Sequence, residues 1–91
     1  MGNVAFSIRI VDEDGDPLEG ISVSASEKGL FGASTPTEYT NEDGWVEFSI
    51  ESVVDDWFCL DVSIGIGTVI EDYTFYDGDT ASFTYSRRFF D

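Results

Sequence analysis

The sequence has no histidine and only one cysteine among its 91 residues. Histidine is the commonest general base and a frequent metal ligand, so its absence removes the side chain on which most hydrolytic and transition-metal sites depend. Cys59 has no second cysteine with which to form an internal disulfide. No strong pairing of a nucleophile with a base occurs elsewhere in the chain. We therefore expect no catalytic centre.

Positive charge is also scarce. Four Lys and Arg residues stand against nineteen Asp and Glu residues, which gives a formal net charge of -15. Without a basic patch the chain has nothing to displace the counterions of a nucleic acid or to bind an anionic membrane. No stretch approaches the roughly 20 apolar residues of a membrane span, and residues 1–10 lack the features of a secretory signal. We expect no nucleic-acid partner and no membrane insertion.

Apolar residues are nevertheless plentiful. Hydrophobic residues make up 42% of the chain and aromatic residues 15%. This content is enough for a hydrophobic core, and the length suits one domain because independent cores usually need roughly 50 to 200 residues. The prediction is a single domain over residues 1–91, with its core in residues 4–86 and a tail at 87–91.

Alternation of apolar and polar residues is the main local pattern. It covers residues 4–11, 21–26, 45–50 and 57–64, and this period of two is typical of half-buried strands. Shorter β-rich runs at 37–40, 69–76 and 81–85 bring the total to about seven strands, and the turn sequence NEDG predicts a hairpin over 37–50. The expected fold is all-β: a seven-stranded, two-sheet Greek-key sandwich of immunoglobulin-like or transthyretin-like type.

The alternation also predicts which side chains face the core. The residues expected to share it come from strands throughout the chain: Phe6, Ile8, Ile21, Val23, Val46, Phe48, Phe58, Leu60, Val62 and Phe83.

Two segments carry a family resemblance. GDPLEGISV, followed some twenty residues later by TNEDGWVEFSI, resembles the turn and strand motifs of the carboxypeptidase regulatory-like, or transthyretin-like, β-sandwich family. The matching positions are Gly15, Pro17, Leu18, Gly20, Ile21 and Val23, then Thr40, Gly44, Val46 and Phe48. The resemblance implies a prealbumin-like sandwich, and its motifs concern turns and core positions rather than an activity.

The catalytic and cross-linked members of that family depend on residues that this chain lacks. Transthyretin-like hydrolases and intradiol dioxygenases need His residues. Collagen-adhesin repeats form an isopeptide bond from a Lys on the first strand, where this chain has Arg9. We expect neither these activities nor the cross-link.

One acidic turn is a candidate metal site. Asp12, Asp14 and Asp16 place carboxylates at alternate positions, which suits a calcium ion with its six to eight oxygen ligands. An EF-hand alignment starting at Asp12 fails, because Pro17 and Val23 stand where Gly and Glu belong. A solvated acidic turn is the alternative to a calcium site.

Aromatic residues are the candidates for ligand or partner contacts. Trp57, Phe89 and Phe90 are singled out, the last two in a tail that also holds Arg87 and Arg88. A set of five aromatic residues is a candidate sugar platform, although aromatic residues in small β-domains often pack in the core or across strands. This set consists of Trp45, Trp57, Tyr39, Tyr73 and Tyr76.

The acidic composition resembles that of haloarchaeal proteins. In molar salt the Debye length falls to about 3 Å, so the repulsion among the carboxylates is screened. An acidic domain from a mesophile is the alternative.

The functional prediction is a non-catalytic accessory or interaction module. We expect it to be protein-binding or structural, adapted to high salt, and attached to or working beside a larger secreted or surface protein. A carbohydrate-binding module is the alternative. Concave aromatic exposure would favour a sugar, whereas a flat apolar patch with a polar rim would favour a protein.

Overall fold

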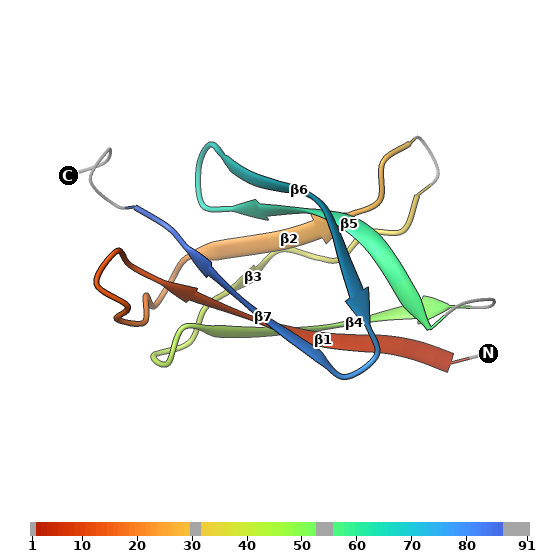
Figure 1. Cartoon of the computed structure of the whole chain (residues 1–91), viewed down its shortest axis with the longest axis horizontal. Helices are drawn as coiled ribbons and strands as arrows, with labels where there is room; N and C mark the ends of the chain where they lie inside the picture. The colour runs from red at the N-terminus through yellow and green to blue at the C-terminus, as the bar shows by residue number, and fades with distance from the viewer. Residues whose placement is uncertain (1, 30–31, 53–55, 87–91) are drawn as a thin grey trace.

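The computed structural model describes residues 2–29, 32–52 and 56–86. These residues form seven strands and no helix, which confirms the all-β prediction (Figure 1). The part of the chain described here therefore contains no helix long and apolar enough to cross a membrane. The strands are β1 (Gly2–Val11), β2 (Ser22–Ser26), β3 (Glu38–Tyr39), β4 (Trp45–Ser52), β5 (Trp57–Ile64), β6 (Thr68–Tyr76) and β7 (Asp79–Thr84).

The strands form two sheets. A three-stranded sheet has the order β4-β1-β7, in which β1 is antiparallel to β4 and parallel to β7. A four-stranded antiparallel sheet has the order β3-β2-β5-β6. The chain passes repeatedly from one sheet to the other, so strands that are distant in the sequence become neighbours, as a Greek-key sandwich requires. The two-sheet prediction is confirmed.

The hairpin predicted over residues 37–50 is wrong. The chain does reverse at the NEDG turn, but β3 pairs with β2 and β4 pairs with β1. Asn41 closes the turn because its Oδ1 accepts hydrogen bonds from the N–H groups of Asp43 and Trp45, each at 3.0 Å. The turn therefore connects the two sheets instead of two strands of one sheet.

The core lies between the sheets and follows the predicted alternation. The predicted core residues are buried, except Phe58 and Phe83, which are partly buried and pack against the others. Phe75 of β6 is fully buried but was not among the predicted residues. Its ring stacks on Phe6 with centroids 4.2 Å apart, so it joins β6 to the opposite sheet.

Thr40 is a buried polar residue that fixes the end of the sandwich. Its Oγ1 accepts a hydrogen bond from the Ile21 N–H at 2.9 Å and donates one to the Leu18 carbonyl at 2.6 Å. Gly20 next to them has a φ of 78°, a conformation that is strained for residues with a Cβ. This arrangement holds the start of β2 against the end of β3 and buries Leu18.

Candidate functional site

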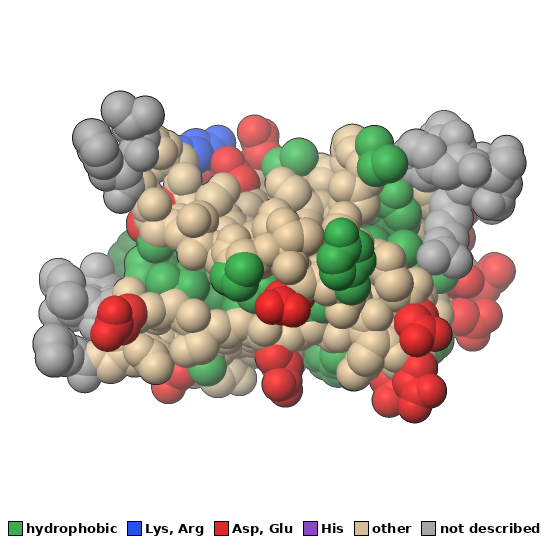
Figure 2. Space-filling view, turned by 180° about the vertical axis from the view of Figure 1, so that it is seen from behind, with side chains coloured by type: hydrophobic (Ala, Val, Ile, Leu, Met, Phe, Trp, Pro, Cys, Tyr) green, Lys and Arg blue, Asp and Glu red, His purple; other side chains and the backbone are tan. Residues whose placement is uncertain are grey.

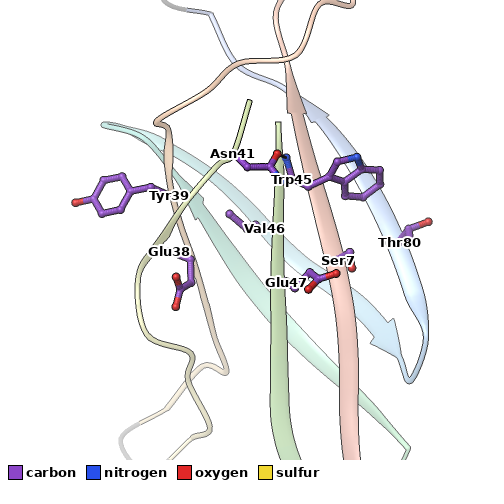
Figure 3. A pocket seen from close by; sticks show the side chains of 8 residues that line it. All are labelled: Ser7, Glu38, Tyr39, Asn41, Trp45, Val46, Glu47 and Thr80. Carbon is purple, nitrogen blue, oxygen red and sulfur yellow. Dashed lines mark hydrogen bonds between the residues drawn. The ribbon is translucent and has the colours of Figure 1, made fainter. Parts of the chain in front are cut away.

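A surface concavity lies beside β4 and is called here the β4 groove. It has a volume of about 650 Å³ (Figure 3). Its lining combines aromatic, hydroxyl, amide and carboxylate side chains with one core residue: Ser7, Glu38, Tyr39, Asn41, Trp45, Val46, Glu47 and Thr80.

The register of the three-stranded sheet brings three of these residues together. Ser7 on β1 lies opposite Glu47 on β4 and opposite Thr80 on β7. Side chains directly opposite one another in a sheet share a face, so this row crosses the outer face of the sheet. The alternation predicts this outward orientation, but the row itself depends on the pairing of strands far apart in the sequence.

Trp45 is held at the groove by its neighbours. The Arg9 guanidinium carbon lies 5.9 Å from the centre of the indole, which is within the range of a cation–π contact. The Arg9 Nε also donates a hydrogen bond to the Asp43 carbonyl at 3.1 Å. The main chain of Trp45 is fixed by Asn41, whose N–H donates to the Trp45 carbonyl at 3.1 Å. Arg9 therefore contacts the indole while anchoring the neighbouring turn.

The other side of the groove comes from the four-stranded sheet. Glu38 and Tyr39 are the two residues of β3, and both are exposed, Tyr39 to 67%. In Figure 3 the Tyr39 and Trp45 rings point away from each other on opposite sides of β4. The two aromatic residues therefore do not form a single flat platform.

A second, smaller concavity continues along the same strand. It has a volume of about 400 Å³ and shares Ser7 and Glu47 with the β4 groove, and it adds Ser49 of β4. The second concavity is lined by β1, β4 and the turn into β7, so the two concavities together lie over the outer face of the three-stranded sheet, next to its edge strand β4. The arrangement offers hydrogen-bonding groups and apolar contacts along an extended line, which suits an extended ligand.

The proposed calcium residues form a closed turn. Oδ1 of Asp12 accepts hydrogen bonds from the N–H groups of Asp14 and Asp16, each at 2.9 Å. Within the described part of the chain, no three acidic, His or Cys side chains are grouped so as to hold a metal ion. The calcium site and the solvated turn both stay predictions, which the addition of calcium distinguishes.

Trp57 lies away from the β4 groove. It is 40% exposed, and its strand partner is Tyr76 of β6, which is 51% exposed. These two residues are therefore neighbours on adjacent strands of the four-stranded sheet. Tyr73 packs instead against Phe75 and Phe83, with ring centroids 4.6 Å and 5.2 Å away. Phe89 and Phe90, with Arg87 and Arg88, lie outside the described residues.

Lys28 lies among three carboxylates at an irregular part of the four-stranded sheet. Its Nζ is 3.8 Å from Asp61, 3.7 Å from Glu71 and 3.6 Å from Asp72. These carboxylates, Asp61 most strongly, raise the pKa of Lys28. Asp72 has a positive φ of 54°, and its N–H donates to Asp61 Oδ1 at 3.0 Å. Acidic side chains are also widespread on the face shown in Figure 2, where Lys and Arg cover only a small area.

No protein-family model matches the chain. A search of curated proteins also found no match.

The sequence pointed to only part of the groove. Tyr39 and Trp45 were candidates because they are aromatic, whereas Ser7, Glu38, Asn41, Glu47 and Thr80 were not predicted to form a site. Their outward positions in alternating strands were the available signal. Small polar residues at such positions are common on every sheet surface, so this signal does not distinguish a site from ordinary exposed residues.

Proposed function

We propose that this domain is a non-catalytic interaction module that binds a protein partner through the β4 groove. The observation that carries the proposal is the position of the groove along an open edge strand, where hydrogen-bonding and apolar groups follow one line. Extended protein segments commonly bind sheet edges in this way. The domain would act beside, or as part of, a larger secreted or surface protein.

A carbohydrate is the second candidate ligand. The exposed Tyr39 ring, the Asn41 amide and the two carboxylates are groups that can contact a sugar. Against this candidate, Tyr39 and Trp45 point apart, and Arg9 already contacts the indole. A protein segment therefore fits the groove better.

We also propose membership of the carboxypeptidase regulatory-like, or transthyretin-like, family. The positions that carry the resemblance have clear structural roles here. Gly44 has a φ of 82°, and a Cβ on it would lie 2.5 Å from the Ile10 carbonyl oxygen, so a larger residue does not fit. Gly20 and Thr40 fix the neighbouring turn, as described above. These roles support the family assignment, which implies an accessory rather than a catalytic domain.

The proposed adaptation to high salt rests on the balance of charges. Nineteen acidic residues oppose four basic ones. The ammonium group of Lys28 has three carboxylates within 4 Å, and many other carboxylates of the described residues are exposed. Such a surface repels itself in dilute buffer, and the repulsion is screened in concentrated salt.

Selection from a displayed peptide library, in parallel with an array of glycans, tests the function. We expect wild-type protein to select peptides, and Tyr39→Ala to weaken their binding by about tenfold, since exposed aromatic residues often dominate interfaces. Tyr76→Ala is the matched control, because it removes another exposed tyrosine from a distant strand. The proposal fails if only glycans bind, or if selected peptides bind Tyr39→Ala as tightly as wild type.

A further inference from the structure

The hydrogen bonds of β4 show which of its main-chain groups face the open edge. The Gly44 carbonyl accepts a hydrogen bond from the Ile10 N–H at 2.8 Å, so Gly44 faces β1. The N–H and carbonyl of Trp45 face the opposite way, toward Asn41. The direction of the main-chain N–H and carbonyl groups alternates along a strand. Those of Val46, Phe48 and Ile50 therefore face β1, and those of the residues between them face the open edge.

Three residues of β4 are therefore available on this edge. They are Glu47, Ser49 and Glu51, and no other strand of the described residues pairs with them. Trp45 is not available, because Asn41 already bonds both its N–H and its carbonyl. The side chains of the three residues are exposed. The open edge thus presents three N–H groups and three carbonyls in a row beside the β4 groove.

The charge along this edge indicates the kind of segment that it would accept. Glu47 and Glu51 lie on the same face of β4, four positions apart, with the small Ser49 between them. Glu38 lines the groove from the neighbouring sheet. An added strand would place its own side chains directly beside these carboxylates, where opposite charges stabilise and like charges destabilise the pairing.

We propose that the β4 edge binds an extended basic peptide segment by strand addition. The segment carries Arg or Lys at two positions spaced four apart, opposite Glu47 and Glu51, and a small residue between them. Main-chain hydrogen bonds to Glu47, Ser49 and Glu51 provide the common part of the interaction. This inference rests on the proposed function, and it specifies the partner's chemistry and the mode of binding.

A second copy of the chain fits this edge less well. Antiparallel pairing of two β4 strands centred on Ser49 would place Glu47 of one copy opposite Glu51 of the other. By symmetry, a second such pair of glutamates would form on the other side of Ser49. Like charges directly opposite each other are destabilising. A basic segment avoids this repulsion.

Hydrogen exchange with a designed peptide tests the proposal. The probe is a peptide of about seven residues with alternating β-branched residues, two Arg spaced four apart and Ser midway between them. We expect the peptide to slow exchange of the Glu47, Ser49 and Glu51 amides by about tenfold or more. The Val46, Phe48 and Ile50 amides are already bonded to β1 and should change little. Replacing both Arg residues by Glu should abolish the effect.

Ser49→Pro separates strand addition from other binding in the groove. Proline removes the outward N–H of Ser49 but leaves the bonds between β4 and β1, and prolines are tolerated on edge strands. We expect peptide affinity to fall by about tenfold or more, as for loss of a central main-chain bond. Ser82→Pro is the matched control on the other edge of the same sheet. The Tyr85 N–H donates to the Val11 carbonyl, so by alternation the main chain of Ser82 faces away from β1.

The outcomes are distinguishable from those of the proposed function. Peptides that bind and lose affinity in Tyr39→Ala, yet leave the three β4 amides unprotected and bind Ser49→Pro normally, would overturn strand addition while keeping the groove as the site. Protection of the three amides by the Glu-substituted peptide would overturn the requirement for basic residues. Self-association through β4, seen as a dimer by sedimentation that Ser49→Pro abolishes, would also overturn the proposal.

Discussion

Replacing Thr40 by Val isolates the contribution of its buried hydroxyl. Valine has nearly the same shape, so the substitution removes two hydrogen bonds without opening a large cavity. The N–H of Ile21 then lacks the acceptor at 2.9 Å, and the Leu18 carbonyl loses the donor at 2.6 Å. Thr40 is only 4% exposed, so water cannot easily replace the hydroxyl.

The expected cost follows from these two lost bonds. A buried group left without its partner costs about 1 to 3 kcal/mol, so we expect Thr40→Val to lower the free energy of unfolding by about 2 to 3 kcal/mol. For a domain of this size that corresponds to a fall in Tm of roughly 10 to 20 °C. Denaturant unfolding and thermal melts followed by circular dichroism measure both quantities.

Two matched variants serve as controls. Thr40→Ser keeps the hydroxyl and loses one methyl group, so it should cost only about 1 kcal/mol. Thr37→Val makes the same chemical change at an exposed position and should leave the stability nearly unchanged. The reasoning is refuted if Thr40→Val is as stable as wild type, or if Thr40→Ser is the less stable of the two Thr40 variants.

Three further predictions follow from the core and the surface charge. Phe75→Ala should lower the free energy of unfolding by about 3 to 5 kcal/mol, because the fully buried ring stacks on Phe6; an unchanged denaturation midpoint would contradict this packing. Molar KCl should raise the Tm by several degrees, and a flat response to KCl would contradict the high-salt proposal. CaCl₂ of equal ionic strength should raise the Tm little further, because Oδ1 of Asp12 already accepts two amide hydrogen bonds, and a large calcium-specific gain would favour the calcium site. Lys28→Met should destabilise the domain at low salt more than at high salt. Since its carboxylate neighbours raise the pKa of Lys28, the stabilisation from its charge is fully present at neutral pH and is lost as the pH rises through that raised pKa. The difference in the free energy of unfolding between wild type and Lys28→Met should therefore shrink at alkaline pH, and a difference that stays constant there would contradict the prediction.

The sequence predicted the strands well where alternation was regular. In β1 and β5 the apolar residues occupy every second position, and those residues form the core. In β6 the alternation breaks, because the pairing with β5 shifts between Leu60 and Val62. Ile70 and Tyr73 consequently both pack against the core despite their odd spacing. The missed burial of Phe75 has the same origin, since a local irregularity changes which residues face inward.

The pairing of strands and the candidate site were harder to predict than the strands. The NEDG turn correctly marks a reversal of the chain, but turn residues do not specify which sheet receives the next strand. That choice depends on long-range contacts, such as β4 pairing with β1 about forty residues earlier. The β4 groove inherits this difficulty, because its lining comes from β1, β3, β4, β7 and the turn containing Asn41.

An NMR titration of ¹⁵N-labelled protein with a peptide obtained by selection from the displayed library tests the central claim most directly. Binding through the β4 groove predicts that the largest shift changes map to Glu38, Tyr39, Asn41 and Glu47, while Trp57 on β5 and Tyr76 on β6 stay unchanged. These shift changes are expected whether or not the peptide adds to β4 as a further strand. Shift changes centred on Trp57 and Tyr76, with the groove residues unaffected, would contradict the account.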